Sequence, residues 1–246
     1  MENIKCALVT GSNRGIGNAI LRALAQAGYQ VIAHARKETP EFADTIRAVA
    51  SETGSTIRPV YFDMTDTETM KKEIKAILKQ KNQIDILVNN AGVAHGSLFQ
   101  MTSMQTVRDV FDVNFFSYLE LTQLLLRPMV KRGNGCIINL ASVSGMDSKA
   151  GNCAYGTSKA AVIAWTRTLA AEVGKLGVRV NAIAPSLADT DMAKQIEEQA
   201  GIDMLRDSAM NRLATPEEIA NVALFLASGK ASFVNGQVIR VDGGIA

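Results

Sequence analysis

Short hydrophobic runs rich in β-branched residues alternate with longer amphipathic stretches along the whole chain of 246 residues. The short runs predict strands at residues 5–9, 30–35, 56–62, 84–89, 135–140, 178–183 and 237–241. The amphipathic stretches predict helices at residues 15–28, 41–52, 67–81, 103–132, 153–175 and 216–227. Several of the short runs are continuously apolar, which is typical of strands that helices cover on both faces.

This alternation indicates a parallel sheet with right-handed crossover connections. No linker rich in proline, glycine or serine interrupts it, and no segment repeats. We therefore expect residues 1–246 to form one Rossmann-type α/β domain, a doubly wound parallel sheet of seven strands with helices on both faces. Residues 186–210 are polar without a clear period, and we expect them to form a substrate lid over a site at the carboxyl ends of the strands.

The composition is that of an ordinary globular protein, with 47% hydrophobic and 20% charged residues and a net charge of +2. The sequence contains neither a basic block nor zinc-finger spacings, so we expect no nucleic-acid partner and no metal site. Its three cysteines form no CxxC pair. Because no apolar run reaches the length of a membrane span and the N-terminus lacks the pattern of a signal peptide, we expect a cytoplasmic protein with no membrane partner.

The first predicted strand runs directly into the sequence TGSNRGIG at residues 10–17. Glycines at such a turn let the backbone approach a pyrophosphate group at the N-terminus of the following helix. Their spacing is Gly-x3-Gly-x-Gly rather than the Gly-x-Gly-x2-Gly of the standard fingerprint, and glycines also serve ordinary turns. The position of this turn between an apolar strand and a helix favours a nucleotide site.

Further motifs follow in order: NNAG at residues 89–92, Asn114, Ser142, Tyr155-x3-Lys159, Pro185, Thr190 and VDGG at residues 241–244. Together with the glycine turn, they resemble the short-chain dehydrogenase/reductase family, and the resemblance extends over residues 4–244. Within that family the chain is most similar to the 3-oxoacyl-[acyl-carrier-protein] reductases. The resemblance implies an oxidoreductase with an NAD(P)-binding Rossmann domain.

The resemblance also implies a set of residues that bind the cofactor. They are Gly11, Ser12, Asn13, Arg14, Gly15, Ile16, Gly17, Arg36, Asp63, Asn90, Ala91, Gly92, Tyr155, Lys159, Pro185, Leu187 and Thr190. Within this set, Asp63 would meet the adenine edge, Asn90 would line the cofactor, and Thr190 would bind the nicotinamide carboxamide.

The residues after the second predicted strand bear on the choice between NADH and NADPH. NAD-dependent enzymes commonly carry an acidic residue there for the ribose 2′-hydroxyl, whereas this chain reads AHARK at residues 33–37. Arg14 and Arg36 would suit a 2′-phosphate through charge-assisted hydrogen bonds, although each alone could be a solvated surface cation. Two arginines and the missing acid predict NADPH/NADP+ as the cofactor.

Tyr155 and Lys159 are four residues apart on a predicted helix, so their side chains share one face. A tyrosine has a pKa near ~10, and ionisation at neutral pH requires that pKa to fall by ~3, equivalent to ~4 kcal/mol. A nearby ammonium group and the positive oxidised nicotinamide would favour the phenolate in this way.

By the resemblance, the nicotinamide delivers a hydride to a carbonyl carbon while Tyr155 delivers a proton to the carbonyl oxygen, and Lys159 also binds the nicotinamide ribose. Ser142, 13 residues before Tyr155, would hydrogen-bond the carbonyl oxygen. Asn114 would hold a water molecule for a proton relay. A YxxxK pair alone is commonplace on helices, but the preceding serine and the upstream NNAG favour the catalytic interpretation of all four residues.

Two positions depart from the family pattern, because Ser186 and Asn211 stand where related reductases usually or often have glycine. We expect these residues to change the backbone at the entrance and exit of the lid. The two histidines, His34 and His95, have no carboxylate or hydroxyl partner at a motif spacing. We interpret both histidines as incidental.

The predicted function is NADPH-dependent reduction of a carbonyl to a secondary alcohol, with a 3-oxoacyl thioester of fatty acid biosynthesis as the expected substrate. A reductase or dehydrogenase of a sugar, polyol or small ketone is the alternative, and a non-catalytic dinucleotide-binding regulator is the third possibility. The complete set of Asn114, Ser142, Tyr155 and Lys159 argues against the regulator.

The resemblance further implies a homotetramer and an acyl carrier protein as a partner. Such reductases commonly display arginines beside the active-site mouth, because the carrier is acidic. Here the usual positions hold Gly133 and Leu176, each preceded by cations: Lys131, Arg132 and Lys175. These cations could dock the carrier or only stabilise helix C-termini, and the sequence leaves both interpretations open.

Overall fold

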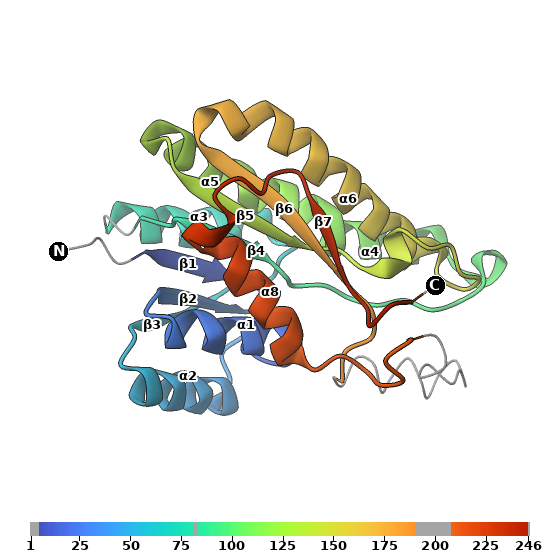
Figure 1. Ribbon diagram of the computed structural model, residues 1–246, viewed down its shortest axis with the longest axis horizontal. Coiled ribbons are helices and arrows are strands. Elements are labelled where there is room, and N and C mark those ends of the chain that lie inside the picture. The colour runs from blue at the N-terminus through green and yellow to red at the C-terminus, as the bar shows by residue number, and fades with distance from the viewer. Residues whose placement is uncertain (1–4, 81–82, 190–207, 246) are drawn as a thin grey trace.

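Seven parallel strands form one sheet in the computed structural model, which describes residues 5–80, 83–189 and 208–245 (Figure 1). They are β1 (Cys6–Val9), β2 (Gln30–Ala35), β3 (Ile57–Tyr61), β4 (Ile86–Asn89), β5 (Gly135–Leu140), β6 (Val178–Pro185) and β7 (Val238–Val241). The strand order is β3-β2-β1-β4-β5-β6-β7, with every neighbouring pair parallel. The order reverses between β1 and β4, where doubly wound sheets bind their ligands.

Helices cover both faces of this sheet (Figure 1). On one face lie α1 (Gly15–Gln26), α2 (Pro40–Thr53) and α8 (Pro216–Ala227). On the other lie α3 (Thr67–Lys79), α4 (Met104–Phe111), α5 (Ser117–Arg132) and α6 (Cys153–Val173). The predicted fold class is therefore confirmed. In the described part of the chain, no helix is long and apolar enough to cross a membrane.

The central strands are apolar on both sides because each side enters a different core. In β1, Ala7 and Val9 belong to the core beneath α1 and α8, whereas Cys6 and Leu8 belong to the core beneath α3 and α5. Successive side chains of a strand point to opposite faces, so a strand covered on both faces has no polar alternation. This arrangement explains the continuous hydrophobic runs in the sequence.

Two buried asparagines tie the sheet to the helices just below its carboxyl edge. The amide of Asn89, at the end of β4, donates to Thr122 on α5 (3.2 Å) and to the side-chain oxygen of Asn139 on β5 (2.8 Å). The amide of Asn139 donates in turn to Thr166 on α6 (2.9 Å). The network fixes the positions of α5, which follows the turn that carries Asn114, and of α6, which carries Tyr155 and Lys159, relative to β4 and β5.

The prediction of one continuous helix over residues 103–132 is wrong. A π-helical turn at Asp112–Phe116 separates α4 from α5. A π turn inserts one extra residue into the helical repeat and often occurs at functional sites, but it barely disturbs the hydrophobic pattern from which a helix is predicted. Asn114 lies at the centre of this turn and is buried.

Candidate active site

The glycine turn after β1 and the segment after β4 form one hydrogen-bonded unit. The hydroxyl oxygen of Thr10 accepts hydrogen bonds from the backbone N–H groups of Asn90 (2.8 Å) and Ala91 (3.0 Å). The side-chain amide of Asn90 donates to the carbonyl oxygens of Thr10 (2.8 Å) and Gly11 (3.1 Å). Asn90 thus holds the glycine turn itself, and two of the motifs that carried the resemblance are in direct contact.

Two glycines of the turn are required by space and backbone geometry. A Cβ atom on Gly17 would lie 2.2 Å from the carbonyl oxygen of Gly11. Gly11 has a φ of +63°, and a Cβ atom there would lie 2.9 Å from the Cα atom of Ala91. No side chain fits either position without moving backbone, so the turn keeps its close contact with the segment after β4.

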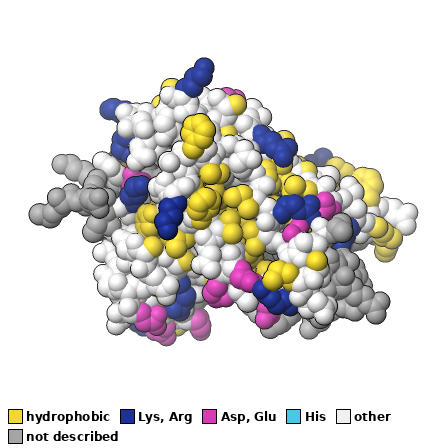
Figure 2. Space-filling view, viewed as in Figure 1, with side chains coloured by type: hydrophobic (Ala, Val, Ile, Leu, Met, Phe, Trp, Pro, Cys, Tyr) yellow, Lys and Arg dark blue, Asp and Glu magenta, His cyan; other side chains and the backbone are white. Residues whose placement is uncertain are grey.

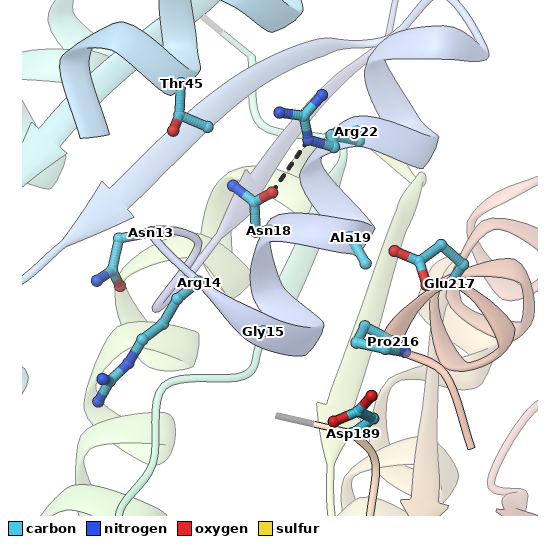
Figure 3. A pocket seen from close by; sticks show the side chains of 10 residues that line it. All are labelled: Asn13, Arg14, Gly15, Asn18, Ala19, Arg22, Thr45, Asp189, Pro216 and Glu217. Atoms are coloured by element: carbon cyan, nitrogen blue, oxygen red, sulfur yellow. Dashed lines mark hydrogen bonds between the residues drawn. The ribbon is translucent and has the colours of Figure 1, made fainter. Parts of the chain in front are cut away.

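The N-terminus of α1 is suited to an anionic group. Arg14 at the start of α1 makes no side-chain cap, as is also true of Asn152 at the start of α6, whereas side chains cap the first turns of α2, α3, α4 and α8. Uncapped N–H groups and the helix dipole at such an end favour a phosphate. This end opens onto a pocket of about 350 Å³ whose opposite wall includes Asp189, Pro216 and Glu217 (Figure 3).

The other residues of the turn have separate tasks. The hydroxyl group of Ser12 is buried and donates to the carbonyl oxygen of His34 (3.1 Å). Ile16 packs against the hydrophobic core under α1, while Asn13 and Arg14 are exposed. Gly15 begins the helix. The turn is therefore anchored through Ser12 and Ile16 and exposes its polar side chains.

The interpretation of His34 as incidental is wrong. This histidine lies on the neighbouring strand β2 and supports the glycine turn. Its Nδ1 atom accepts from the N–H of Gly11 (3.1 Å), and its Nε2 atom lies 2.9 Å from the carbonyl oxygen of Phe62 and must carry the proton. The ring stacks on that of Phe62 at 4.1 Å between centroids. Burial lowers the pKa of His34 to about 4, so the ring is neutral at physiological pH. The signal in the sequence was a histidine inside an otherwise apolar strand.

Charged residues lie where β2 and β3 end. Arg36 directly follows β2 and is exposed, like Arg14. Asp63 accepts from the backbone N–H (2.9 Å) and the hydroxyl group (2.8 Å) of Thr65. The hydrogen bonds from Thr65 and the nearby charge of Arg36 hold the pKa of Asp63 below its ordinary value. This edge therefore offers two guanidinium groups and one ionised carboxylate.

Asn114 fixes the backbone that follows NNAG. Its amide donates to the carbonyl oxygen of Val93 (2.9 Å) and to the hydroxyl group of Ser158 (3.2 Å), and its oxygen accepts from the N–H of Val93 (2.8 Å). A Cβ atom on Gly92 would lie 3.0 Å from the Asn114 oxygen and 3.6 Å from the Lys159 Nζ atom. The structure therefore brings Gly92, Asn114 and Lys159 together.

The side chain of Ser142 lies close enough to Tyr155 to affect the pKa of its phenol. Ser142 follows β5, is buried, and its oxygen accepts from the N–H of Ser144 (3.1 Å). Part of Tyr155 remains exposed, yet its surroundings are dense enough that burial raises its pKa, and the hydroxyl group of Ser142 offsets only part of this rise. The expected lowering of the Tyr155 pKa is thus outweighed by burial, and the phenol carries its proton at neutral pH.

Lys159 is buried one helical turn after Tyr155. Its Nζ atom donates to the carbonyl oxygen of Leu140, the last residue of β5, at 2.8 Å. Burial lowers the pKa of Lys159 to about 7. The end of β5 therefore positions Ser142 through the chain and Lys159 through a backbone hydrogen bond.

The end of β6 forms the base of the predicted lid. Pro185 is buried, and Ser186 donates its N–H to the carbonyl oxygen of Val241 (3.1 Å) with an ordinary negative φ, so the substitution for glycine leaves the backbone unstrained. The carbonyl oxygen of Leu187 accepts from the N–H of Ala214 (3.4 Å).

At the exit of the lid, Asn211 has a φ of +51°, a left-handed conformation that asparagine tolerates better than most residues other than glycine. Its identity therefore preserves the turn that a glycine would make. Thr190 and most of the predicted lid, residues 190–207, lie outside the described residues.

The cations proposed for carrier docking do not lie beside this site. Lys131 and Arg132 end α5 and Lys175 precedes β6, so they lie at the amino edge of the sheet, opposite the carboxyl edge that carries Tyr155. The guanidinium group of Arg132 donates to the carbonyl oxygen of Ile84 (2.8 Å) and lies 3.8 Å from the carboxylate of Asp85. Within one subunit, the interpretation of these residues as neighbours of the active-site mouth is wrong.

Comparisons with known proteins assign this arrangement to a family. The family model described as enoyl-(acyl carrier protein) reductase matches residues 11–246. The chain is 36% identical over 243 residues to the 3-oxoacyl-[acyl-carrier-protein] reductase FabG of Chlamydia muridarum and 38% identical over 245 residues to that of Aquifex aeolicus. Each alignment covers 98% of this chain and 97% of the relative. The chain belongs to the short-chain dehydrogenase/reductase family.

Solved structures show the same fold. A protein assigned as a gluconate dehydrogenase from Agrobacterium tumefaciens has a TM-score of 0.92 and 30% identity over 98% of this chain and 95% of its own. A protein assigned as an NAD(P)-dependent gluconate 5-dehydrogenase from Beutenbergia cavernae was solved with bound NADP. It has a TM-score of 0.91 and 33% identity, and the alignment covers 98% of this chain and 96% of its own. This short-chain dehydrogenase/reductase is an oxidoreductase.

The buried, neutral His34 predicts a loss of stability in acid. The unfolded chain takes up a proton near pH 6.5, whereas folded His34 resists protonation until about pH 4. The stability that depends on neutral His34 is therefore complete above the unfolded pKa and falls with pH below it, by about 2 kcal/mol between pH 7 and pH 5. Urea unfolding at both pH values measures this loss.

His34→Asn should remove most of this pH dependence, while His95→Asn, a change at the second of the two histidines, should keep it. An equal pH dependence in wild type and His34→Asn would show that another group titrates in this range.

Proposed function

We propose that this protein is an NADPH-dependent carbonyl reductase that converts a 3-oxoacyl thioester into a 3-hydroxyacyl thioester. The observation that carries the proposal is the convergence of Ser142, Tyr155 and Lys159 at the carboxyl edge of β5, next to the β4 segment that holds the glycine turn. The match to 3-oxoacyl-[acyl-carrier-protein] reductases over 98% of the chain supports the choice of substrate.

The residues present fit a dinucleotide phosphorylated on its ribose. The uncapped N-terminus of α1 would receive the pyrophosphate, and the close contact of Gly11 with the segment after β4 keeps side chains out of its path. Arg14 and Arg36 would bind the 2′-phosphate, since both are exposed and β2 ends without an acid. Asp63 would accept from the adenine edge.

When bound, the nicotinamide supplies the hydride that adds to the carbonyl carbon. Tyr155 donates its proton to the carbonyl oxygen, so the C=O group becomes a CH–OH group. The raised pKa of Tyr155 suits this direction, because a donor must hold its proton until the oxygen becomes negative. The hydroxyl group of Ser142 stabilises the developing charge on the same oxygen.

Lys159 and Asn114 support Tyr155 after the proton has left. The ammonium group of Lys159 stabilises the phenolate and would hold the nicotinamide ribose. The side-chain amide of Asn114 holds Val93 and Ser158 in position by hydrogen bonds. A water molecule near this turn would return a proton to the site.

The rim of the site favours an acyl chain over a sugar. Val93 after β4 and Met146 after β5 are exposed. Met210 is exposed too, and its N–H donates to the carbonyl oxygen of Gly243, which follows β7 (3.1 Å). Three apolar side chains on segments at the carboxyl edge suit a hydrocarbon chain. Burial of a hydrocarbon chain lowers the free energy of binding, whereas burial of a polyol does not. The gluconate dehydrogenases among the structural relatives make a keto-sugar acid the second candidate substrate.

The proposed assembly is a homotetramer, and the proposed partner is an acyl carrier protein. Hydrophobic side chains gather across the middle of the face that carries α8 and β7 (Figure 2). Two exposed aromatic residues belong to this part of the chain: Phe225 on α8 and Phe233 in the segment that leads to β7. Apolar patches of this kind often mark subunit interfaces. The FabG relatives are named as reductases of substrates on the acyl carrier protein, which supports this choice of partner.

A substrate panel tests the function directly. We expect NADPH oxidation to be fastest with an acetoacetyl thioester and slower with simple ketones and keto-sugar acids. Tyr155→Phe should reduce kcat by roughly 10²–10⁴-fold with little change in the Kd of NADPH, because only the proton donor is lost. Preference for a keto-sugar acid would establish the second candidate, and NADPH binding without turnover of any carbonyl would establish a regulator.

Reversing the charge of Arg36 tests the choice of cofactor. Arg36→Asp should weaken NADPH relative to NADH by at least about tenfold, since a lost charge-assisted hydrogen bond costs roughly 1.5–3 kcal/mol. Lys37→Asp, the same charge change at the next exposed residue, should leave the ratio of the two Kd values nearly unchanged. Equal weakening of both cofactors by Arg36→Asp would show that Arg36 does not reach the phosphate.

A further inference from the structure

Tyr118 is a large polar side chain in the interior for which the reaction proposed above has no use. It lies on α5, four residues beyond Asn114, and is fully buried in a cluster with Ala141, Val162 and Ile163. Its hydroxyl group has no hydrogen-bond partner among the described residues. An unpaired buried hydroxyl destabilises a fold, so packing alone would be served better by phenylalanine.

The ring of Tyr118 makes a specific contact with Lys159. The Nζ atom lies 5.4 Å from the centre of this ring and 5.9 Å from the centre of the Tyr155 ring. An ammonium group has three donors, and in the described part of the chain only the Leu140 carbonyl oxygen accepts from this one. Aromatic faces attract a cation, most strongly where water is excluded.

Burial and the aromatic rings act on Lys159 in opposite directions. Burial is the cause that lowers the pKa of Lys159 to about 7. Facing its ammonium group, among the described residues, are Tyr118 from α5, Tyr155 from α6, the Leu140 carbonyl at the end of β5 and the backbone at Gly92 after β4. Burial raises the pKa of both tyrosines, so they are neutral rings, and none of these described groups brings a negative charge to Lys159.

We propose that Tyr118 is a positioning residue whose ring holds the ammonium group of Lys159 in its charged form and in place beside Tyr155. This inference rests on the proposed function in one respect only, which is that Lys159 takes part in the reaction. The contact itself belongs to the protein without ligands, so it is testable without turnover.

Substitutions at Tyr118 separate the ring from the hydroxyl group. Tyr118→Phe keeps the ring and removes the unpaired hydroxyl, whereas Tyr118→Leu removes the ring. Tyr118→Met is a second variant without a ring, and its longer, unbranched side chain reaches further into the same space. Carbon-13 NMR of the lysine ε carbons in the apoenzyme measures the pKa of Lys159, with the resonance assigned by its absence in Lys159→Met.

We expect Tyr118→Phe to retain the wild-type pKa of Lys159 with an equal or higher Tm. The two variants without a ring should lower that pKa by roughly 0.5 to 1, because an attraction that favours the charged form is lost. The ammonium group is lost as pH rises through its pKa. The alkaline limb of kcat/KM for NADPH-dependent reduction should therefore move to lower pH by the same amount in these variants and stay in place in Tyr118→Phe.

An unchanged pKa of Lys159 in the variants without a ring would overturn the proposal, whatever their activity. A lowered pKa in Tyr118→Phe equal to that in Tyr118→Leu would also overturn it, because the hydroxyl group would then be the active part. If wild type reduced no carbonyl and yet only the variants without a ring lowered the Lys159 pKa, the proposed function would fail and the contact would stand.

Discussion

An ammonium group enclosed by protein, with no carboxylate facing it in the described part of the chain, remains charged only if the polar groups and rings around it replace water. Lys159 meets this constraint with one backbone carbonyl, that of Leu140, and with two tyrosine rings. The same enclosure keeps the proton on Tyr155, since burial opposes the phenolate. The exclusion of water at the end of β5 therefore keeps the proton on the phenol, whereas the Leu140 carbonyl and the two rings favour the charged form of Lys159 against that same effect.

The fold serves this constraint by bringing chain segments together at one edge. All strands are parallel, so the glycine turn after β1, the NNAG segment after β4 and Ser142 after β5 share the carboxyl edge of the sheet. Thr10 and Asn90 join the first two of these segments by hydrogen bonds, and Asn114 fixes the continuation of the second. Movement of one segment would disturb the cofactor turn and the catalytic residues together.

Prediction from the sequence succeeded where a local pattern has one physical cause. Continuous apolar runs gave the strands because helices cover both faces, and the motif order placed Ser142, Tyr155 and Lys159 at one edge. It failed where the cause lies in tertiary contacts. The π turn at Asp112–Phe116 leaves the hydrophobic period almost intact, and the supporting roles of His34 and Tyr118 depend on neighbours far away in the sequence.

The placement of the carrier-docking cations beside the active-site mouth of their own subunit was wrong for a related reason. Lys131 and Arg132 were placed beside the active-site mouth because of their position in the sequence. The direction of β5 puts them at the amino edge of the sheet, where Arg132 contacts Ile84 and Asp85. In a parallel sheet, residues that precede a strand lie at the amino edge and residues that follow it lie at the carboxyl edge. Lys131 and Arg132 precede β5, whereas the catalytic Ser142 follows it.

The protonation state of Tyr155 tests the account most directly. Carbon-13 NMR of the tyrosine ζ carbons in the apoenzyme resolves the four tyrosines, and the resonance absent from Tyr155→Phe identifies the one of interest. We predict that Tyr155 stays protonated through the neutral range and ionises only above its ordinary pKa of about 10. Ionisation of Tyr155 at or below neutral pH in the apoenzyme would show that burial does not hold the proton on the phenol.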